Sequence, residues 1–251
     1  MTEYHTKYSK INPSLYDSDV RRVKSRKILR VIQDFSKKNT GDSRCLEVGC
    51  STGVNTIFLS DHMLECIGVD IDAPALKHAR LHSPSNTGFV EGDAMNLPFG
   101  EGVFDIVICN HVYEHLPDSK LLMDEIFRCL KPGGFCYFGA GNKYAVMEGH
   151  YKLPFLSWLP RSLSHVYLMV TKKGSRYYEK HLSYFALKRL VRNFSVTDYT
   201  IRIIREPDRF GAGDMIKSNS AVTKIPVGLL RASLPLIPTF IFILEKPCRK
   251  E

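Results

Sequence analysis

From Arg44 to Ala140, short apolar runs alternate strictly with helical stretches, and this alternation constrains the fold more than any other feature. Five runs rich in Val, Ile, Phe and Cys are predicted to be strands: Cys45–Val48, Glu65–Asp70, Phe89–Glu91, Phe104–Cys109 and Phe135–Gly139. Three segments between them are predicted to be helices: Asn55–Asp61, Pro74–His82 and Ser119–Leu130. Strands and helices in this order predict an α/β fold, a parallel sheet with helices on both faces.

The segments on either side differ from this core. Residues 1–42 contain a predicted amphipathic helix over Asp19–Lys38, and we interpret its face of arginines and lysines as solvated charge. Residues 143–251 begin with an aromatic, basic stretch that lacks a clear period. They continue with a predicted helix and two predicted strands: Ser183–Arg192, Ser195–Arg205 and Phe240–Leu244. We expect 1–42, 43–142 and 143–251 to form one domain overall.

The formal charge of +9 is unevenly distributed. Residues 1–42 hold ten basic and five acidic residues, net +5; residues 43–142 hold six and thirteen, net −7; residues 143–251 hold nineteen and eight, net +11. A basic chain suggests nucleic acid or an anionic surface as a partner. The acidic middle contradicts this suggestion for the core, so the basic excess points to whatever meets the flanking segments.

The sequence predicts neither a disulfide framework, nor a metal site, nor a membrane span. The seven cysteines form no C-x-x-C pair, and most lie in apolar runs. Residues 1–12 lack the pattern of a secretion signal, so we expect a cytoplasmic protein. The apolar segment Ile225–Leu244 contains Arg231 and three prolines, which oppose a spanning helix. Peripheral contact with a membrane surface stays open.

A glycine-containing turn follows the first predicted strand, in the sequence Leu46-Glu-Val-Gly-Cys-Ser-Thr-Gly53. Small residues there let a ligand approach the backbone, and the helix start offers free N–H groups. The spacing Glu-x-Gly-x-x-x-Gly differs from the G-x-G-x-x-G of dinucleotide binders, which argues against an NAD-dependent dehydrogenase. A carboxylate at Glu47 would repel a pyrophosphate but suits a ligand with a positive charge.

Polar residues also follow the next three strands. Asp70 ends the second strand, Asp93 follows the third, and Asn110 with His111 follows the fourth. The carboxyl ends of parallel strands meet at one edge of the sheet, where such folds bind ligands. An acidic residue at the end of the second strand can accept hydrogen bonds from a ribose diol. A nucleotide-like ligand is therefore expected at this edge.

Four segments together resemble the class I S-adenosylmethionine-dependent methyltransferases, in the small-molecule group that includes the ubiquinone-biosynthesis type: LEVGCSTG, IGVDID, VEGDAMNLPF and FDIVICNHVYEHLPDSKLLMDEIFRCLKPGG. The resemblance is strong over residues 40–142. It implies a Rossmann-like, doubly wound, seven-stranded sheet, mostly parallel with an antiparallel last strand. It also implies a helical lid in 1–42, a cofactor-binding core in 43–142 and acceptor contacts in 143–251. The implied cofactor is S-adenosylmethionine, with S-adenosylhomocysteine as product.

The resemblance assigns roles to single residues. Glu47 and the turn of Gly49, Cys50, Ser51 and Gly53 would hold the methionine part and the ribose. Asp70, followed by Ile71, would accept hydrogen bonds from both ribose hydroxyls, while Asp93 and Ala94 would face the adenine. Asn110 and His111 would line the sulfonium side. Ser51 departs from the family pattern, in which glycine is common at this position.

The acceptor is expected to meet residues after the fifth strand. Glu148 and His150 would point the same way in an extended segment, so either is a candidate general base, and His115 is a third candidate. The alternative is that His150 is a hydrogen-bonded structural residue. The apolar stretch Leu153–Leu163, with Trp158, suggests an acceptor lid, a membrane contact or simple packing over the sheet edge.

These features favour methyl transfer to a small-molecule acceptor, which could be lipid-linked or anionic. One alternative is an RNA or DNA methyltransferase, but Asn110-His-Val-Tyr113 lacks the two prolines of the loop that clamps a flipped base, so a nucleic-acid partner is disfavoured. The other alternative is a non-catalytic S-adenosylmethionine-binding module. The sequence leaves the acceptor, and the choice between monomer and homodimer, undetermined.

Overall fold

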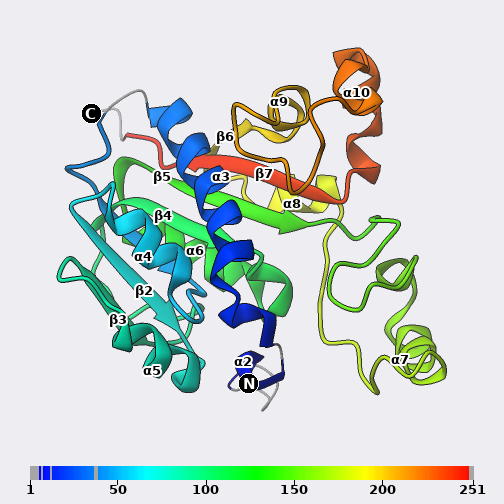
Figure 1. Cartoon of the computed structure of the whole chain (residues 1–251), viewed down its shortest axis with the longest axis horizontal. Helices are drawn as coiled ribbons and strands as arrows, with labels where there is room; N and C mark the ends of the chain where they lie inside the picture. The colour runs from blue at the N-terminus through cyan, green and yellow to red at the C-terminus, as the bar shows by residue number, and fades with distance from the viewer. Residues whose placement is uncertain (1–5, 7, 12, 37–38, 249–251) are drawn as a thin grey trace.

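A seven-stranded sheet in the order β3-β2-β1-β4-β5-β7-β6 forms the centre of the computed structural model, which describes residues 6, 8–11, 13–36 and 39–248 (Figure 1). The strands are β1 Arg44–Val48, β2 Glu65–Asp70, β3 Thr87–Glu91, β4 Phe104–Asn110, β5 Leu130–Gly141, β6 Ser195–Asp198 and β7 Thr239–Glu245. Strands β1 to β5 pair in parallel, and β7 runs antiparallel to both of its neighbours. The expected mostly parallel, Rossmann-like sheet with an antiparallel last strand is confirmed.

Helices cover both faces of this sheet. The α-helices are α2 Tyr8–Ile11, α3 Ser18–Ser36, α4 Val54–Ser60, α5 Ala73–Leu81, α6 Ser119–Cys129, α7 Arg161–Val170, α8 Tyr184–Leu190, α9 Thr200–Arg205 and α10 Val227–Ser233. In Figure 1, α3 and α4 lie in front of the sheet and α6 lies behind it. Apolar side chains of α3, α4 and α9 form one core cluster, and those of α6 and α8 form the other.

The alternation of side chains along each strand explains the two cores. In β4, Val107 and Cys109 point into the α6–α8 cluster, whereas Ile106 and Ile108 point into the α3–α4 cluster. Both faces of the central strands are therefore buried. This arrangement explains why the sequence there reads as continuous apolar runs.

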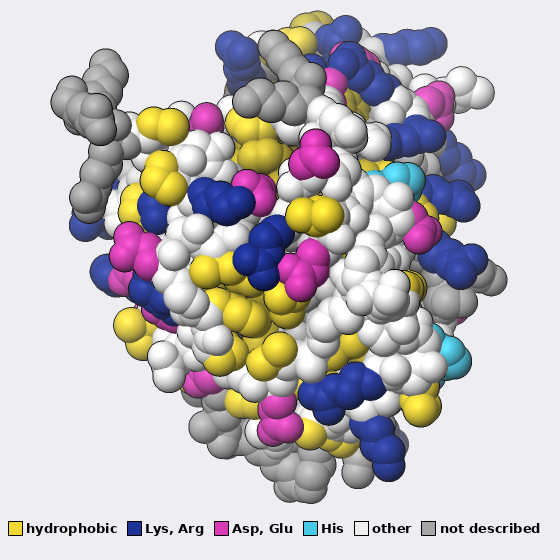
Figure 2. Space-filling view, turned by 90° about the vertical axis from the view of Figure 1, so that its left-hand side faces the viewer, with side chains coloured by type: hydrophobic (Ala, Val, Ile, Leu, Met, Phe, Trp, Pro, Cys, Tyr) yellow, Lys and Arg dark blue, Asp and Glu magenta, His cyan; other side chains and the backbone are white. Residues whose placement is uncertain are grey.

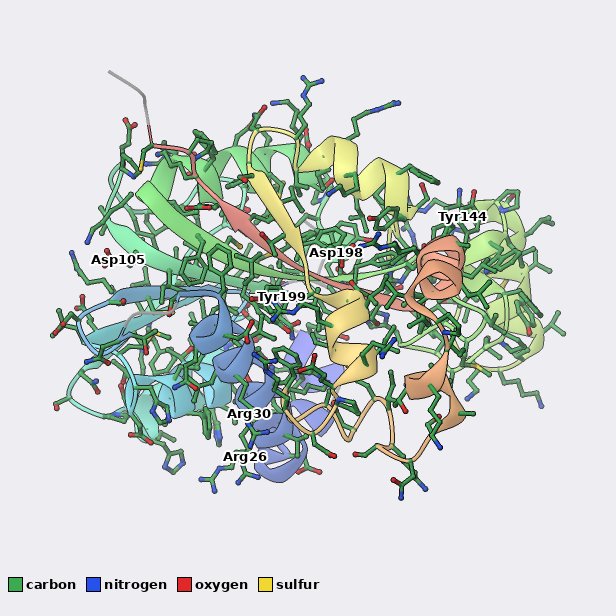
Figure 3. The ribbon with its side chains drawn as sticks, turned by 90° about the horizontal axis from the view of Figure 1, so that it is seen from above. Arg26, Arg30, Asp105, Tyr144, Asp198 and Tyr199 are labelled. Carbon is green, nitrogen blue, oxygen red and sulfur yellow. The ribbon has the colours of Figure 1, made fainter. Side chains whose placement is uncertain are left out.

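The C-terminal part corrects one expectation. The segment Ser195–Arg205 was predicted to be one strand, but the strand ends at Asp198 and α9 follows. The carboxylate of Asp198 accepts a hydrogen bond from the amide of Thr200 at 2.9 Å, which turns the chain into the helix. Figure 3 shows Asp198 and Tyr199 at this junction. The sequence predicted Ile203 and Ile204, which are buried, to be strand residues, because an apolar run this short fits the period of a strand as well as that of a helix.

Two further segments differ from their sequence patterns. The stretch without clear period contains α7, and Ile225–Leu244 folds as α10, a short 3-10 turn and β7. Within the described residues, no helix is both long enough and apolar enough to cross a membrane.

Basic and acidic side chains lie interspersed on the β3 side of the molecule (Figure 2). On this face the positive net charge does not form one continuous basic surface. Such a surface is the usual electrostatic feature of a nucleic-acid-binding domain, and this face lacks it.

Candidate cofactor and acceptor site

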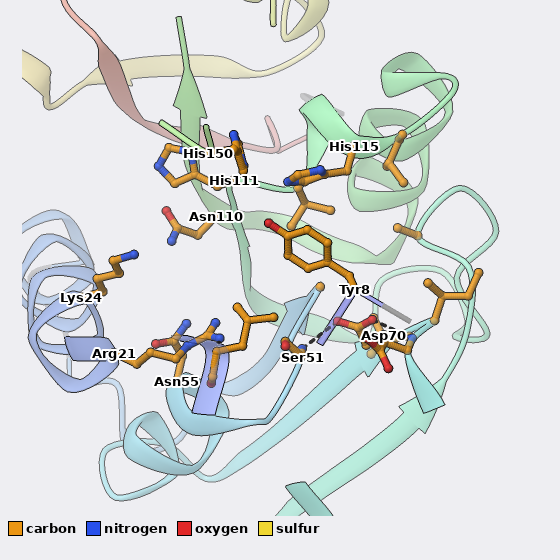
Figure 4. A pocket seen from close by; sticks show the side chains of 18 of the residues that line it. Tyr8, Arg21, Lys24, Ser51, Asn55, Asp70, Asn110, His111, His115 and His150 are labelled. Atoms are coloured by element: carbon orange, nitrogen blue, oxygen red, sulfur yellow. Dashed lines mark hydrogen bonds between the residues drawn. The ribbon is translucent and has the colours of Figure 1, made fainter. Parts of the chain in front are cut away.

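One cavity of about 600 Å³ opens at the carboxyl ends of β1, β2 and β4, beside the N-terminal part of α3 (Figure 4). Eight of the eleven expected cofactor residues line it: Gly49, Ser51, Asp70, Ile71, Asp93, Ala94, Asn110 and His111. Of the expected catalytic residues, His115 and His150 line it and Glu148 does not. The structure thus brings the ends of separate strands together as the sequence pattern suggested.

Asp70 forms the acidic end of the cavity. Its Oδ2 accepts a hydrogen bond from the amide of Ser51 at 2.7 Å, and its Oδ1 accepts one from the amide of Asp72 at 2.9 Å. Burial raises the pKa of Asp70, and the two amide hydrogen bonds oppose this rise. Each carboxylate oxygen keeps a second lone pair. The carboxylate is therefore fixed in place and still able to accept hydrogen bonds from a ligand.

Asp72 and Asp93 lie beside Asp70. Asp72 accepts a hydrogen bond from the amide of Ala75 at 3.2 Å and so caps α5. Its other oxygen accepts a hydrogen bond from the amide of Ser9 at 2.7 Å, which ties the N-terminal segment to the cavity. Asp93 accepts a hydrogen bond from the amide of Met95 at 2.8 Å.

The turn after β1 requires glycine for steric reasons. Gly49 has a φ of +72°, and a Cβ there would lie 2.6 Å from Cγ2 of Val112. The amides of Gly49 and Cys50 both donate to the carbonyl of Val69. Ser51 has a φ of +52° although it carries a side chain. The backbone is thereby held close to the cavity.

Three expected cofactor residues lie behind the cavity wall. Cys50 and Gly53 are both buried. Glu47 is 3% exposed, and its carboxylate accepts hydrogen bonds from Asn55 Nδ2, at 2.8 Å, and from the Thr56 hydroxyl. Burial raises the pKa of Glu47. Glu47 itself does not line the cavity, and its carboxylate orients Asn55, which does.

Basic side chains form the opposite end. Arg21 and Lys24 of α3 and Lys152 line the cavity, so part of the helix face that we interpreted as solvated charge borders it. Lys27 is also buried, and its Nζ lies 3.0 Å from Asp214 Oδ2. Burial, together with the charges of Arg21 and Lys27, lowers the pKa of Lys24. Figure 4 shows Arg21 and Lys24 facing the cavity from one side.

Three histidines also line the cavity: His111, His115 and His150. His111, with a φ of +58°, follows β4 directly, and its Nδ1 lies 3.1 Å from Glu114 Oε1. Burial opposes the charged form of Glu114, but the hydrogen bond with His111 and the nearby imidazoles outweigh it and lower its pKa to about 2. Burial lowers the pKa of His115 to about 4 despite the charge of Glu114.

Glu148 lies behind His150. Its Oε1 is 2.8 Å from His150 Nδ1 and 3.3 Å from His181 Nε2, while its Oε2 accepts hydrogen bonds from the amides of His150 and Tyr151. Burial alone would raise the pKa of Glu148. The hydrogen bonds with the two imidazoles outweigh burial and hold this pKa well below its usual range. Burial alone would lower the pKa of His150. The hydrogen bond with Glu148 outweighs burial, so the pKa of His150 is raised.

Sequence reasoning missed several cavity and cluster residues: Asp17, Arg21, Lys24, Lys152, Glu179 and His181. These residues are distant in sequence from the strand ends. One signal was available: Arg21 and Lys24 lie on a helix directly before β1, and such a helix can close over the sheet edge.

Comparison with known proteins agrees with this geometry. Residues 46–138 match a family model described as methyltransferase domain. A demethylmenaquinone methyltransferase from Staphylococcus saprophyticus is 35% identical over 138 residues, 52% of this chain and 58% of that protein. A ubiquinone biosynthesis O-methyltransferase from Bordetella avium is 30% identical over 149 residues, 55% of this chain and 61% of that protein. The chain spans about three fifths of the length of these two relatives.

Among solved structures, the PH0226 protein from Pyrococcus horikoshii has a similar fold. It superposes with a TM-score of 0.60 over 95% of this chain and 98% of that chain, at 17% sequence identity. This likeness extends the shared fold beyond the matched segment to almost the whole chain. Residues 46–138 therefore match a methyltransferase domain by sequence, and almost the whole chain shares the fold of the PH0226 protein.

Proposed function

We propose that this protein transfers the methyl group of S-adenosylmethionine to a small anionic acceptor. The observation that carries the proposal is the division of one cavity into an acidic end at Asp70 and a basic end at Arg21, Lys24 and Lys152. A cationic sulfonium compound and an anionic acceptor are complementary to such a division. The family match supports the reaction class.

The residues at the acidic end fit the cofactor. Asp70 offers two fixed carboxylate oxygens, which suit a ribose diol, and Gly49 allows a ligand to approach the turn closely. Asp93 and Ala94 would border the adenine, and Asn110 would border the methionine sulfur. When bound, the cofactor supplies an electrophilic methyl group on a positively charged sulfur.

The protein's own residues would mainly position the acceptor. Lys24 and Lys152 would attract its negative group, which would place the nucleophile near His111, His115 and His150. If the nucleophile is a hydroxyl group, His115 or His150 would remove its proton, as both line the cavity. Glu148 is 1% exposed and holds the His150 ring through Nδ1, so we assign it a positioning role.

A more specific version of this proposal is that the acceptor is linked to a lipid. Exposed apolar side chains lie on and before α7: Phe155, Trp158, Leu163, Val166, Met169 and Val170. Arg161, Lys172 and Lys173 lie in the same segment and would face anionic headgroups. Co-sedimentation with vesicles containing anionic lipid tests this form. Binding that is equal for wild type and Trp158→Ala with Val170→Ser would exclude this segment as the contact.

Calorimetric titration with S-adenosylmethionine tests the cofactor assignment. We expect one site per chain, and a folded protein that shows no binding would refute the proposal. A transfer assay with labelled cofactor, run on lipid, phosphate or carboxylate, and nucleic-acid pools, tests the acceptor. We expect label in an anionic small-molecule or lipid pool. Label only in the nucleic-acid pool would support the alternative instead.

A further inference from the structure

A cluster of imidazoles and carboxylates lies in the wall of the cavity and behind it. From it we infer that the protein binds a divalent transition-metal ion through Glu114, His115 and His150. The sequence did not suggest a metal site, because its cysteines lack ligand spacing and His150 is far from Glu114 in the chain. Folding brings them together: Glu114 and His115 lie in the turn after β4, and His150 lies in the loop after β5.

The geometry of the three side chains suits one ion. Each can place one ligand atom within 4.8 Å of the other two. A zinc-like ion, with bonds of about 2.0–2.2 Å, holds its ligand atoms roughly 3.5 Å apart, so small side-chain rotations would close the site. Two imidazoles and one carboxylate are a set that Zn²⁺ and non-haem Fe²⁺ both accept.

Two buried atoms of this set lack a hydrogen-bond partner among the described residues. They are Oε2 of Glu114, whose side chain is completely buried, and Nδ1 of His115. A buried polar atom without a partner destabilises the folded state, because it has lost its hydrogen bonds to water. Such atoms in native proteins usually indicate a bound water or ion. A cation at this point would provide the partner that Glu114 Oε2 lacks.

The orientation of His150 supports the same reading. Its Nδ1 lies 2.8 Å from Glu148 Oε1, and Glu148 is itself held by two backbone amides. A proton on Nδ1 that is donated to Glu148 leaves Nε2 as a lone-pair donor toward the cavity. A carboxylate behind a metal-binding histidine commonly fixes its ring in this way. His111 plays a comparable part for Glu114, because it occupies Oε1 and leaves Oε2 available.

The charge of the cluster also favours a cation. Glu114, Glu148 and Glu179 are 0%, 1% and 2% exposed. Buried carboxylates require counter-charges or many hydrogen bonds. The facing groups from neighbouring elements are four imidazoles, His111, His115, His150 and His181. A divalent ion would neutralise two of the three negative charges without requiring several of these imidazoles to be protonated.

The site would face the acceptor. His115 and His150 line the cavity, so an ion bound to them would keep an open position toward it. An acceptor oxygen in that position would lose its proton to solvent more easily, so in the metal-bound protein the ion would replace His115 and His150 as the group that activates a hydroxyl. This role rests on the proposed function, whereas metal binding itself does not.

Direct metal binding tests the inference. The full chain, stripped with a chelator and dialysed, is titrated calorimetrically with ZnCl₂, and bound metal is measured by mass spectrometry. We expect one ion per chain, and we expect Co²⁺ to give the visible absorption of a low-symmetry site. His115→Gln and His150→Gln should each weaken binding more than about 100-fold, and Glu148→Gln about 10–100-fold. His62→Gln, at an exposed histidine outside the cluster, should bind like wild type.

Two outcomes would overturn the inference: a folded wild-type chain that takes up no stoichiometric metal, or equal affinity in the cluster variants and the His62 control. Far-UV circular dichroism of each variant separates lost binding from lost folding, and the glutamine variants preserve size and polarity. S-adenosylmethionine binding, measured on the same metal-free preparation, keeps the two proposals apart. Its presence without metal binding overturns only the metal site, and its absence overturns only the cofactor assignment.

Discussion

The two ends of the cavity are built from different parts of the chain. The acidic end comes from strand ends within residues 46–138, where Asp70 and Asp93 follow β2 and β3. The basic end comes from outside that segment, from α3 and from the loop that carries Lys152. Under the proposed function, the segment that matches the family model would hold the cofactor, and the flanking segments would supply most of the contacts to the acceptor. This division explains why the family match indicates the chemistry more readily than the acceptor.

The largest expected effect is at Asp70. Asp70→Ala removes two acceptors of charge-assisted hydrogen bonds, each contributing about 1.5–3 kcal/mol, so affinity for S-adenosylmethionine should fall at least about 100-fold. Calorimetry measures this, with Glu101→Ala, at an exposed acidic position, as the control. Unchanged affinity in Asp70→Ala would mean that the ribose does not lie at the acidic end.

The turn after β1 should be nearly as sensitive. Gly49→Ala places a methyl group 2.6 Å from Val112 Cγ2 in a backbone conformation with φ +72°, so we expect a loss of about 1–3 kcal/mol in the free energy of unfolding. Urea denaturation measures it. The double variant Gly49→Ala with Val112→Ala should recover the steric part only. Full stability in the single variant would contradict the close approach.

The basic end can be weakened separately. Lys24→Gln should raise KM for an anionic acceptor about three- to tenfold, with affinity for S-adenosylmethionine unchanged. Arg26→Gln is the matched control, because Arg26 lies on the same helix, is exposed and points away from the sheet (Figure 3). Raised salt should reduce the difference between Lys24→Gln and wild type. Equal KM values for Lys24→Gln and Arg26→Gln would contradict the proposal that the acceptor binds at the basic end.

The smallest expected effect is a pH dependence at Glu47. A carboxyl group whose pKa is raised by folding contributes most below its unfolded pKa, and this contribution is lost as pH rises through the folded value. The ordinary value here is 4.5, and burial raises it. Relative to Glu47→Gln, wild type should therefore lose unfolding free energy as pH rises above 4.5. Urea denaturation between pH 4 and pH 7 measures this, and a difference that grows the other way would contradict it.

Local patterns predicted the cofactor half well. The bounds of β2 agree with the expected strand, and Asp70 lies at its end, because strand period and strand-end chemistry are short-range properties. The acceptor half depends on contacts between distant segments. Lys24 reaches the cavity only because α3 packs over the sheet, and His181 reaches Glu148 across the fold. The hydrophobic period of a sequence does not reveal such contacts. The strand predicted over Ser195–Arg205 ends early, at Asp198, whose carboxylate accepts a hydrogen bond from the Thr200 amide.

A crystal structure of the chain with S-adenosylhomocysteine tests the division of the cavity most directly. The account predicts ribose hydroxyls hydrogen-bonded to the Asp70 carboxylate, the adenine beside Asp93, and the sulfur directed toward Asn110 and His111. Lys24 and Lys152 should then border the remaining space. A ligand whose sugar lies at the basic end, or one bound outside this cavity, would contradict the account.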